Sequence, residues 1–271
     1  MTNEQKTVKI FAYILAALIC ISVFSAIVGG IGFIASWFDS DFDEPYVTEK
    51  LNTANIDIEK IDELEIEIKS SSLEIKSGSD FSINKDSSNS ELDIRVKGSS
   101  LIISERHHGL WFRRRSGKII IVLPDTKTLE KLQIDQGAGR ITIDDISTSY
   151  FELDQGAGTL DINNCEFDHT DIDGGVGKLT VRNSSIKNLD LDAGVGSVDM
   201  EAKLLGRTDI DGGVGSIELT IQGRKEDYAF NIEKGLGSVT VDGDSVSGNF
   251  GTGSNRVEID GGVGSIKVEF D

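Results

Sequence analysis

The stretch of this sequence that most resembles a chemical site is residues 174–178, GGVGK, which is similar to a phosphate-binding loop. Such a loop needs the pattern G-x-x-x-x-G-K-[ST], whose lysine reaches the phosphates and whose hydroxyl binds magnesium. Here Leu179 follows the lysine, and Ile172 stands where the first glycine should be. No helical pattern follows that could direct an N-terminus at a phosphate. We therefore do not expect nucleotide binding at this stretch.

A second possible chemistry is calcium binding by the acidic residue that precedes each glycine turn. The GGVG letters are similar to the calcium-binding nonapeptide G-G-x-G-x-D-x-U-x, but Leu179, Ile217 or Ile266 stands where its aspartate should be. Stacked copies would still place carboxylates about 4.8 Å apart, and a divalent cation would relieve their repulsion. We favour carboxylates held by turn amides and screened by salt, with calcium as the weaker alternative. This aspartate ladder comprises Asp135, Asp154, Asp173, Asp192 and Asp211.

A third candidate is the segment 105–118, ERHHGLWFRRRSGK, which is the dense positive cluster of an otherwise acidic chain. Arginine clusters bind phosphates through paired hydrogen bonds, and tryptophan beside arginine suits a lipid headgroup surface. Anionic envelope polymers or phospholipids are therefore the expected ligands, and the alternative is a solvated hairpin tip. The candidate binding residues are Arg106, Trp111, Phe112, Arg113, Arg114, Arg115 and Lys118.

Catalysis and a zinc site find little support in the sequence. His107 and His108 are adjacent, His169 lies in a polar corner, and no Cys/His spacing resembles a zinc site. A catalytic pair of carboxylates should break the repeat, yet the longest departures, 222–231 and 244–255, contain no acid/base or nucleophile set. We expect no enzyme activity, no cofactor and no metal, and keep a sugar-polymer hydrolase or lyase as an alternative.

The glycine turn recurs seven times and predicts the fold. Its acidic residue falls at 135, 154, 173, 192, 211, 233 and 260, mostly 19 residues apart. A fixed period near 20 with alternating apolar residues on both sides of each turn predicts a β-solenoid, whose coils pair about 4.8 Å apart. The regular repeats begin at about residue 132, and Ser70-Ser71-Ser72 replaces the glycine turn in an expected first coil. The sequence thus predicts an all-β solenoid over 61–271.

Each position of the turn has an expected role. The acid should accept a hydrogen bond from the backbone two residues on, and the glycines should permit positive φ and close packing. The residue between the last two glycines is apolar in all seven copies, as at Val176, so we expect it to plug the inside of the corner. The sequence ends directly after a repeat, so we also expect an open solenoid end that the charges of Lys267, Glu269 and Asp271 protect from pairing.

The N-terminal part predicts a membrane anchor. Residues 10–38 carry no charge and are long enough to cross a bilayer as a helix, and too long for a cleaved signal peptide. Lysines precede this run and acids follow it, so residues 1–9 should be cytoplasmic and the bulk extracellular. Residues 39–60 form an acidic linker. The net charge of −19 argues against nucleic acid as a partner, and two cysteines make no disulfide framework.

The stacked D-x-G-x-G turns, the lead-in KIIIVLPDTKTLEKLQID and the N-terminal anchor resemble a bacterial family called "putative adhesins", which includes LiaG-like proteins of the Gram-positive cell envelope. The resemblance covers roughly residues 60–271. It implies a surface-exposed β-solenoid linked to envelope stress response or adhesion, without an established catalytic site. We therefore expect a single-pass, membrane-anchored interaction or envelope-stress sensing module. The alternative is an adhesin for host or neighbouring-cell surfaces. Envelope proteins are further possible partners, and the oligomeric state stays open.

Overall fold

The computed structural model of this chain describes residues 48–86, 90–107 and 117–271. They belong to one compact unit, Pro45–Asp271. The expected cytoplasmic N-terminus and membrane helix, at 1–9 and 10–38, lie outside the described residues. Within the described part of the chain, no helix is long and apolar enough to cross a membrane.

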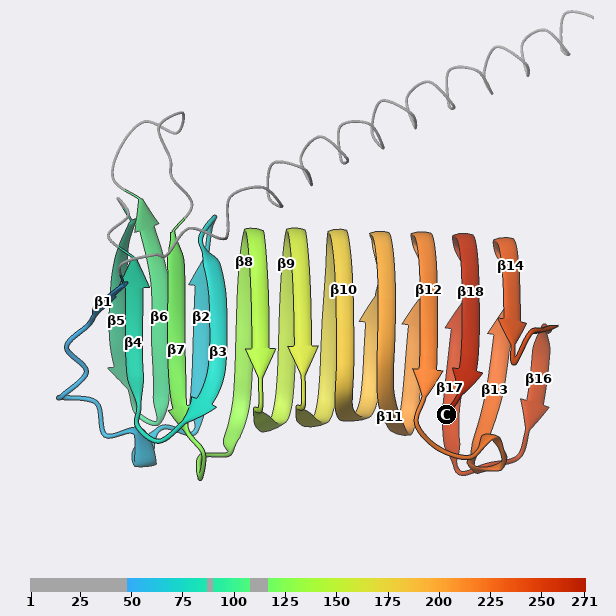
Figure 1. Cartoon of the computed structure of the whole chain (residues 1–271), viewed down its shortest axis with the longest axis horizontal. Helices are drawn as coiled ribbons and strands as arrows, with labels where there is room; N and C mark the ends of the chain where they lie inside the picture. Colours follow the sequence, from blue (N-terminus) through green and yellow to red (C-terminus); the bar gives the residue numbers. More distant parts are fainter. Residues whose placement is uncertain (1–47, 87–89, 108–116) are drawn as a thin grey trace, which may run out of the picture. The chain divides into compact units, whose positions relative to one another are not determined.

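The central part of this unit is built from long strands that bend around glycine corners. β8 (Leu129–Asp144), β9 (Ser147–Asn163) and β10 (Glu166–Asp192) lie side by side (Figure 1). They pair in parallel with a shift of one repeat, so that Asp135 lies beside Asp154 and Asp154 beside Asp173. The predicted all-β solenoid and its repeat are therefore confirmed.

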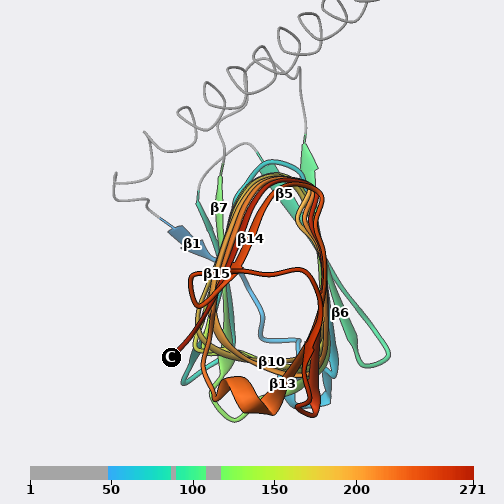
Figure 2. The ribbon, with the colours of Figure 1, turned by 90° about the vertical axis from the view of Figure 1, so that its right-hand side faces the viewer.

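Each coil has two long faces that meet at the glycine corner. β11 (Val195–Asp211) and β12 (Val214–Ile221) continue the same arrangement beside β10. A short third side closes the coil opposite the corner, where residues 184–187 of β10 pair with residues 202–205 of β11. Viewed along the axis, the coils superimpose as a narrow closed outline (Figure 2).

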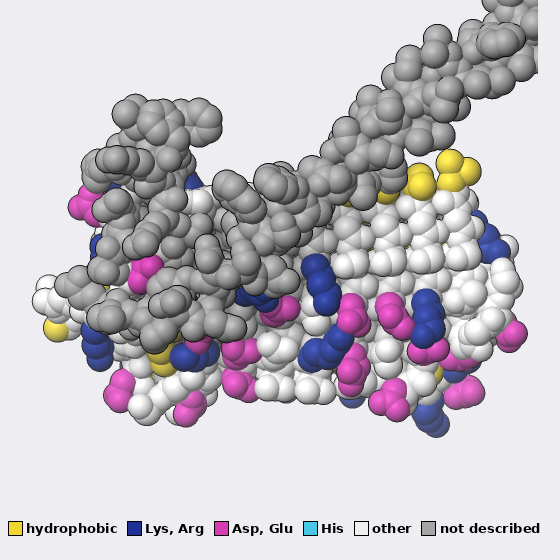
Figure 3. Space-filling model, turned by 45° about the horizontal axis from the view of Figure 1, so that its top comes forward, with side chains coloured by type: hydrophobic (Ala, Val, Ile, Leu, Met, Phe, Trp, Pro, Cys, Tyr) yellow, Lys and Arg dark blue, Asp and Glu magenta, His cyan; other side chains and the backbone are white. Residues whose placement is uncertain are grey.

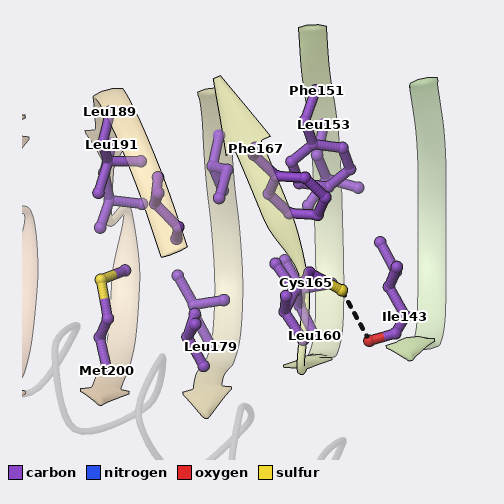
Figure 4. Packing of buried hydrophobic residues seen from close by; sticks show 14 of the residues in the cluster. Ile143, Phe151, Leu153, Leu160, Cys165, Phe167, Leu179, Leu189, Leu191 and Met200 are labelled. Carbon is purple, nitrogen blue, oxygen red and sulfur yellow. Dashed lines mark hydrogen bonds between the residues drawn. The ribbon is translucent and has the colours of Figure 1, made fainter. Parts of the chain in front are cut away.

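The core is a file of apolar side chains between the two faces. Alternation directs every second residue inward, so Leu153 and Leu160, on opposite sides of one glycine corner, are both buried. The rings of Phe151 and Phe167 stack with centroids 4.5 Å apart, next to the buried Cys165 (Figure 4). Neighbouring coils thus bury one another's apolar residues, which no coil could do alone.

The N-terminal coils are not stacked in sequence order. β2 (Glu63–Ile68) pairs with both β6 (Ser100–His107) and β8, and β3 (Ser72–Gly78) pairs with both β7 (Lys118–Pro124) and β8. The coil formed by β2 and β3, which is the expected degenerate first coil, therefore lies between the β6–β7 coil and β8.

Antiparallel strands cover this N-terminal end. β5 (Ser90–Lys97) pairs with β6, β4 (Ser82–Asp86) pairs with β7, and β1 (Thr48–Lys50) pairs with β4. β1 and the short helix η1 (Ile58–Lys60) fall within the segment expected to be an acidic linker. The outermost parallel coil is thus not left with an open edge.

The C-terminal coils are also out of sequence order. β17 (Asn255–Asp260) pairs with β11 on one side and β13 (Tyr228–Glu233) on the other. β18 (Val263–Phe270) likewise pairs with β12 and β14 (Leu236–Val241). The last coil in the sequence is therefore internal, and the β13–β14 coil is outermost (Figure 1).

The two longest departures from the repeat explain this arrangement. Residues 222–227, with the short helix η3 (Lys225–Asp227), carry the chain from β12 past one coil position to β13. Residues 242–254 return it and form the cap strands β15 (Asp244–Ser245) and β16 (Gly248–Gly251), which pair antiparallel with β14 and β13. The expectation of an open end after the last repeat is therefore wrong, because that repeat is enclosed and the end is capped.

Candidate functional site

One long face of the solenoid carries two parallel rows of carboxylates, and we call it the acidic face. It consists of the strand halves that precede the glycine corners. In-register pairing and the repeat place like side chains beside one another along the axis. The row next to the corner contains Glu67, Asp135, Asp154, Asp173, Asp192, Asp211, Asp260 and Glu233. The second row contains Glu65, Glu152, Asp171, Asp190, Asp209 and Glu258.

Crowding on this face changes the ionisation of its carboxyl groups. Partial burial, and then the charges of Asp154 and Asp192, raise the pKa of Asp173 above its usual range. Partial burial and the neighbouring Asp260 raise the pKa of Asp211 in the same way. The carboxylates repel one another, as expected for like charges directly opposite on adjacent strands. The acidic face therefore favours protons or cationic groups over anions.

The expected turn hydrogen bond forms at one of these aspartates. The Gly194 amide donates to Oδ1 of Asp192 at 3.0 Å, and Gly194 has a φ of +55°. Among the glycine turns that the structure describes, the other acids make no such bond, so that expectation is wrong for most copies. Within the described residues, no group of three or more His, Cys, Asp or Glu side chains could hold a metal ion. The ladder offers one carboxylate per coil instead of a cage.

The opposite long face carries paired charges, and we call it the mixed-charge face. Arg140 binds Asp161 at 2.9 Å, and Arg182 binds Asp199 on the next coil. Basic and acidic side chains lie side by side on this face (Figure 3). The Arg182 guanidinium lowers the pKa of the Asp199 carboxyl. The negative charge of the protein is therefore concentrated on the acidic face.

The two described ends of the predicted binding segment are held by carboxylates. Arg106, near the end of β6, forms an ion pair with Asp93 of β5, and Lys118, at the start of β7, binds Glu74 at 2.7 Å. Burial would raise the pKa of Glu74, but hydrogen bonds from Lys118 and Lys76 lower it. Trp111, Phe112, Arg113, Arg114 and Arg115 lie outside the described residues. Their role as ligand-binding residues stays a prediction.

The two strands that flank the segment do not form a hairpin with each other. β6 and β7 pair with β2 and β3, which lie on opposite faces of the solenoid, and not with each other. The chain between β6 and β7, residues 108–117, is therefore longer than Lys69-Ser70-Ser71, which joins β2 to β3. The two strands that flank it form the outermost parallel coil at the N-terminal end.

A buried glutamate next to this corner was not expected from the sequence. Glu105 is 1% exposed, and its Oε2 accepts hydrogen bonds from the Lys69 and Ser70 amides at 2.8 and 3.0 Å. The Ser71 hydroxyl donates to the same carboxylate. A concave row of amides of this kind binds anions, so Glu105 neutralises the serine corner. The signal was available, because Leu101, Ile103 and Glu105 alternate inward along one strand.

The apolar residue of the glycine turn does not plug the corner. Leu236 is 79% exposed and Val263 is 47% exposed, and Val176 is not among the residues packed in the core. The side chain that fills the corner belongs to the residue after the acid, as at Gln136, which is 0% exposed and donates to the Ser71 carbonyl at 2.9 Å. The plug expectation is therefore wrong, and the apolar row forms an outer edge, seen as hydrophobic side chains at the upper right of Figure 3.

The remaining candidate reactive groups, a cysteine and a histidine, pack against other residues of the solenoid. Burial raises the pKa of the Cys165 thiol to about 12, so this thiol stays protonated and unreactive at neutral pH. The His169 ring stacks on the exposed Tyr150 with centroids 4.8 Å apart. The longest departures from the repeat also have structural roles. Residues 222–231 connect β12 to β13 and include the start of β13, and residues 244–255 include the cap strands β15 and β16.

Comparison with known proteins places this geometry in a family. A family model described as Toastrack DUF4097 matches residues 61–269. Among curated proteins, none matches this chain. A crystal structure of a "putative cell adhesion protein" from Clostridium sporogenes is 14% identical, with a TM-score of 0.41, and the match covers 84% of this chain and 100% of that one. A "putative adhesin" from Bacteroides fragilis is 16% identical, with a TM-score of 0.40, covering 83% and 98%.

Proposed function

The chain belongs to the Toastrack DUF4097 family, and on that premise we propose that it is a non-enzymatic cell-surface interaction module that binds anionic polymers of the envelope. The ligand-binding part is the long corner between β6 and β7. The acidic face repels the same ligands and restricts binding to that corner.

The observation that carries this proposal is a long basic segment, in the sequence between β6 and β7, within a stack whose described glycine corners are tight. The glycine corners of β8, β9 and β10 are so close that a Cβ on Gly158 or Gly177 would lie 1.8 Å from the carbonyl oxygen of the preceding coil. Residues 108–117 break this pattern with arginines and two aromatic residues. A departure from a stacked repeat that adds charge and aromatic surface is typical of a binding loop.

Charge pairing at the ends of the segment divides its residues by role. Arg106 and Lys118 form ion pairs with Asp93 and Glu74, so we assign them to positioning the ends of the segment. The three consecutive arginines at 113–115 are the proposed phosphate ligands. Guanidinium groups bind phosphate through paired hydrogen bonds. Trp111 and Phe112 would contact the apolar parts of the polymer or of a headgroup.

Membrane attachment belongs to the same proposal. The uncharged run 10–38 would anchor the chain with its N-terminus in the cytoplasm, as the lysines before it and the acids after it favour. The solenoid would then lie outside the membrane, where teichoic-acid-type polymers are found. An envelope-stress sensing role would use the same binding step.

The test is binding of the full chain, in a neutral detergent, to polyglycerol phosphate, the backbone of such polymers. We expect the wild type to bind, and the triple variant Arg113→Ser, Arg114→Ser, Arg115→Ser to lose most of the affinity. Affinity should also fall as salt is raised, because ionic contacts between exposed groups are screened.

A matched control separates a local site from net charge. Replacing Lys50, Lys97 and Lys203 by serine removes the same number of charges from exposed positions elsewhere. This control should bind as the wild type does. Equal loss in both variants would contradict a local site, and release of reducing sugars from peptidoglycan or teichoic acid would contradict the absence of catalysis.

A further inference from the structure

The C-terminal coil fills a slot whose two walls come from earlier parts of the chain. One wall is the β11–β12 side, where Asp209 pairs with Glu258 of β17 and Ile217 with Ile266 of β18. The other wall is the β13–β14 coil, which pairs with the opposite edges of the same two strands. Both walls are complete in sequence before residue 255 is reached.

Lys234 distinguishes the outermost coil from the internal ones. In most other coils the residue after the acid is Gly, Ala or a buried Gln, because its side chain faces the core. A lysine at an internal position would place its ammonium group in that core. In the outermost coil Lys234 is exposed, and its Nζ donates to the Ser245 hydroxyl of the cap at 3.1 Å. Lys234 therefore favours the outermost place for the β13–β14 coil.

The outermost coil depends on the inserted one. Within the described residues, the parallel strand partners of β13 and β14 are β17 and β18. Aromatic contacts follow the same path, since the ring of Phe270 in β18 lies 5.4 Å from Tyr228 and 6.0 Å from Phe230. Without β17 and β18, both walls would present unpaired edges, which are templates for another strand pair.

We propose that this slot is a binding site for a two-stranded glycine-corner segment, filled by the chain's own β17–β18 and able to accept β17–β18 of a second copy of the chain. The connection 242–254 would act as the hinge, opening the cap strands β15 and β16 to reach the neighbour. Such an exchange of identical elements gives a dimer with no new type of contact. This inference does not depend on the proposed polymer binding.

The slot is selective for this occupant. A Cβ on Gly264 would lie 1.7 Å from the Gly215 carbonyl oxygen, so the entering strand must carry a glycine there. It must also present apolar residues at the places of Val257, Ile259 and Ile266, which are buried. A second copy's C-terminal segment satisfies every one of these requirements.

Full-length chains with one introduced surface cysteine, which keep the buried Cys165, test the exchange. Ser216 of β12, Ser265 of β18 and Ser238 of β14 are exposed, and Ser265 is in register with each of the other two. Adjacent strands are about 4.8 Å apart, which a disulfide can bridge. In a Cys20→Ser background, chains with Ser216→Cys and chains with Ser265→Cys would be co-expressed with different tags and oxidised. We expect a disulfide-linked heterodimer, and a second one for Ser238→Cys with Ser265→Cys.

Two controls make the outcome decisive. Ser197 of β11 lies one coil further from Ser265, about 9.6 Å away, so Ser197→Cys with Ser265→Cys should give several-fold less product. One chain carrying both Ser216→Cys and Ser265→Cys should form the bond internally and validate the register. Absence of the heterodimers despite that internal bond, or equal yields with Ser197→Cys, would overturn the proposal. A heterodimer through Ser216 but not Ser238 would also overturn it, since the whole end would then be exchanging.

Discussion

Asp173 lies in the middle of the carboxylate row on the acidic face, and stacking of the coils makes its ionised form less favourable. Its counterparts Asp154 and Asp192 lie on the neighbouring coils, and burial together with their charges raises its pKa. A carboxyl group whose pKa is higher in the folded protein destabilises the fold when it is ionised. The penalty is present at neutral pH and is relieved as the pH falls through the raised pKa.

We therefore expect Asp173→Asn to stabilise the protein by about 0.5 kcal/mol at neutral pH, the order of a cross-strand charge pair. The gain should shrink as the pH is lowered through the raised pKa of Asp173, and it should also shrink in high salt. Thermal or denaturant unfolding at several pH values measures it.

Asp199→Asn on the mixed-charge face is the matched control. Arg182 lowers the pKa of Asp199, so this carboxylate stabilises the fold above its usual pKa, and that contribution is lost as the pH falls through the lowered value. The substitution should therefore destabilise the protein at neutral pH. Stabilisation by both substitutions, or by neither, would contradict the difference between the two faces.

At the same scale, sequence reasoning predicted residue types better than side-chain directions. The apolar character of Val176 and its counterparts suggested an interior plug, but an extra residue at the glycine corner changes the inward–outward alternation. Regular alternation from Ile134 turns Gln136 inward, and the change after that position leaves residues such as Leu236 exposed. Alternation is a reliable guide along a strand, and it fails where the backbone turns with glycine conformations that other residues avoid.

Among the elements, the glycine corner is the one that makes close stacking possible. Gly177 has a φ of +156°, and a Cβ on it would lie 1.8 Å from the Gly158 carbonyl oxygen. Backbone contact of this kind cannot be relieved by a rotamer change, so any side chain must separate the coils.

We expect Gly177→Ala to lower the free energy of unfolding by more than about 3 kcal/mol, which places it among severe backbone substitutions. Gly98 is the matched control, because its φ is +65° but a Cβ added to it would meet no atom within 4 Å. Gly98→Ala should cost only the conformational strain, about 1–2 kcal/mol. Chemical denaturation compares them, and equal losses would mean that conformation alone explains the glycine requirement.

The repeat period predicted the coil, its corners and its core, because each is a local property of about 19 residues. The order of the end coils was not predicted, since spacings of 22 and 27 residues are equally compatible with insertions in a sequential stack. Lys234 was the residue in the sequence that indicated an outermost coil, because the equivalent position faces the core in internal coils. Likewise Glu105 at an inward position pointed to the serine corner.

At the scale of the whole molecule, the two long faces of the solenoid differ in charge, and the candidate ligand-binding segment follows a strand at one end of the stack. The acidic face covers the length of the stack, and the mixed-charge face carries ion pairs such as Arg140–Asp161. The strands that flank the basic segment, β6 and β7, form the outermost parallel coil at the N-terminal end. Under the proposed function, a polyanion would be repelled by the acidic face and bound near the β6–β7 coil. The candidate binding residues form a contiguous charged run in the sequence, and their role stays a prediction. The place of the flanking strands β6 and β7 at the end of the stack could not be predicted, since it depends on the order of the coils.

Hydrogen exchange of the full chain, measured with and without polyglycerol phosphate, tests binding at the basic corner most directly. We predict slower amide exchange in peptides that cover residues 105–118 and unchanged exchange along the acidic face between residues 132 and 219. The same protection should be absent in the variant with serine at positions 113, 114 and 115. Protection spread along the acidic face, or none in 105–118 at polymer concentrations that saturate binding, would contradict a local site at this corner.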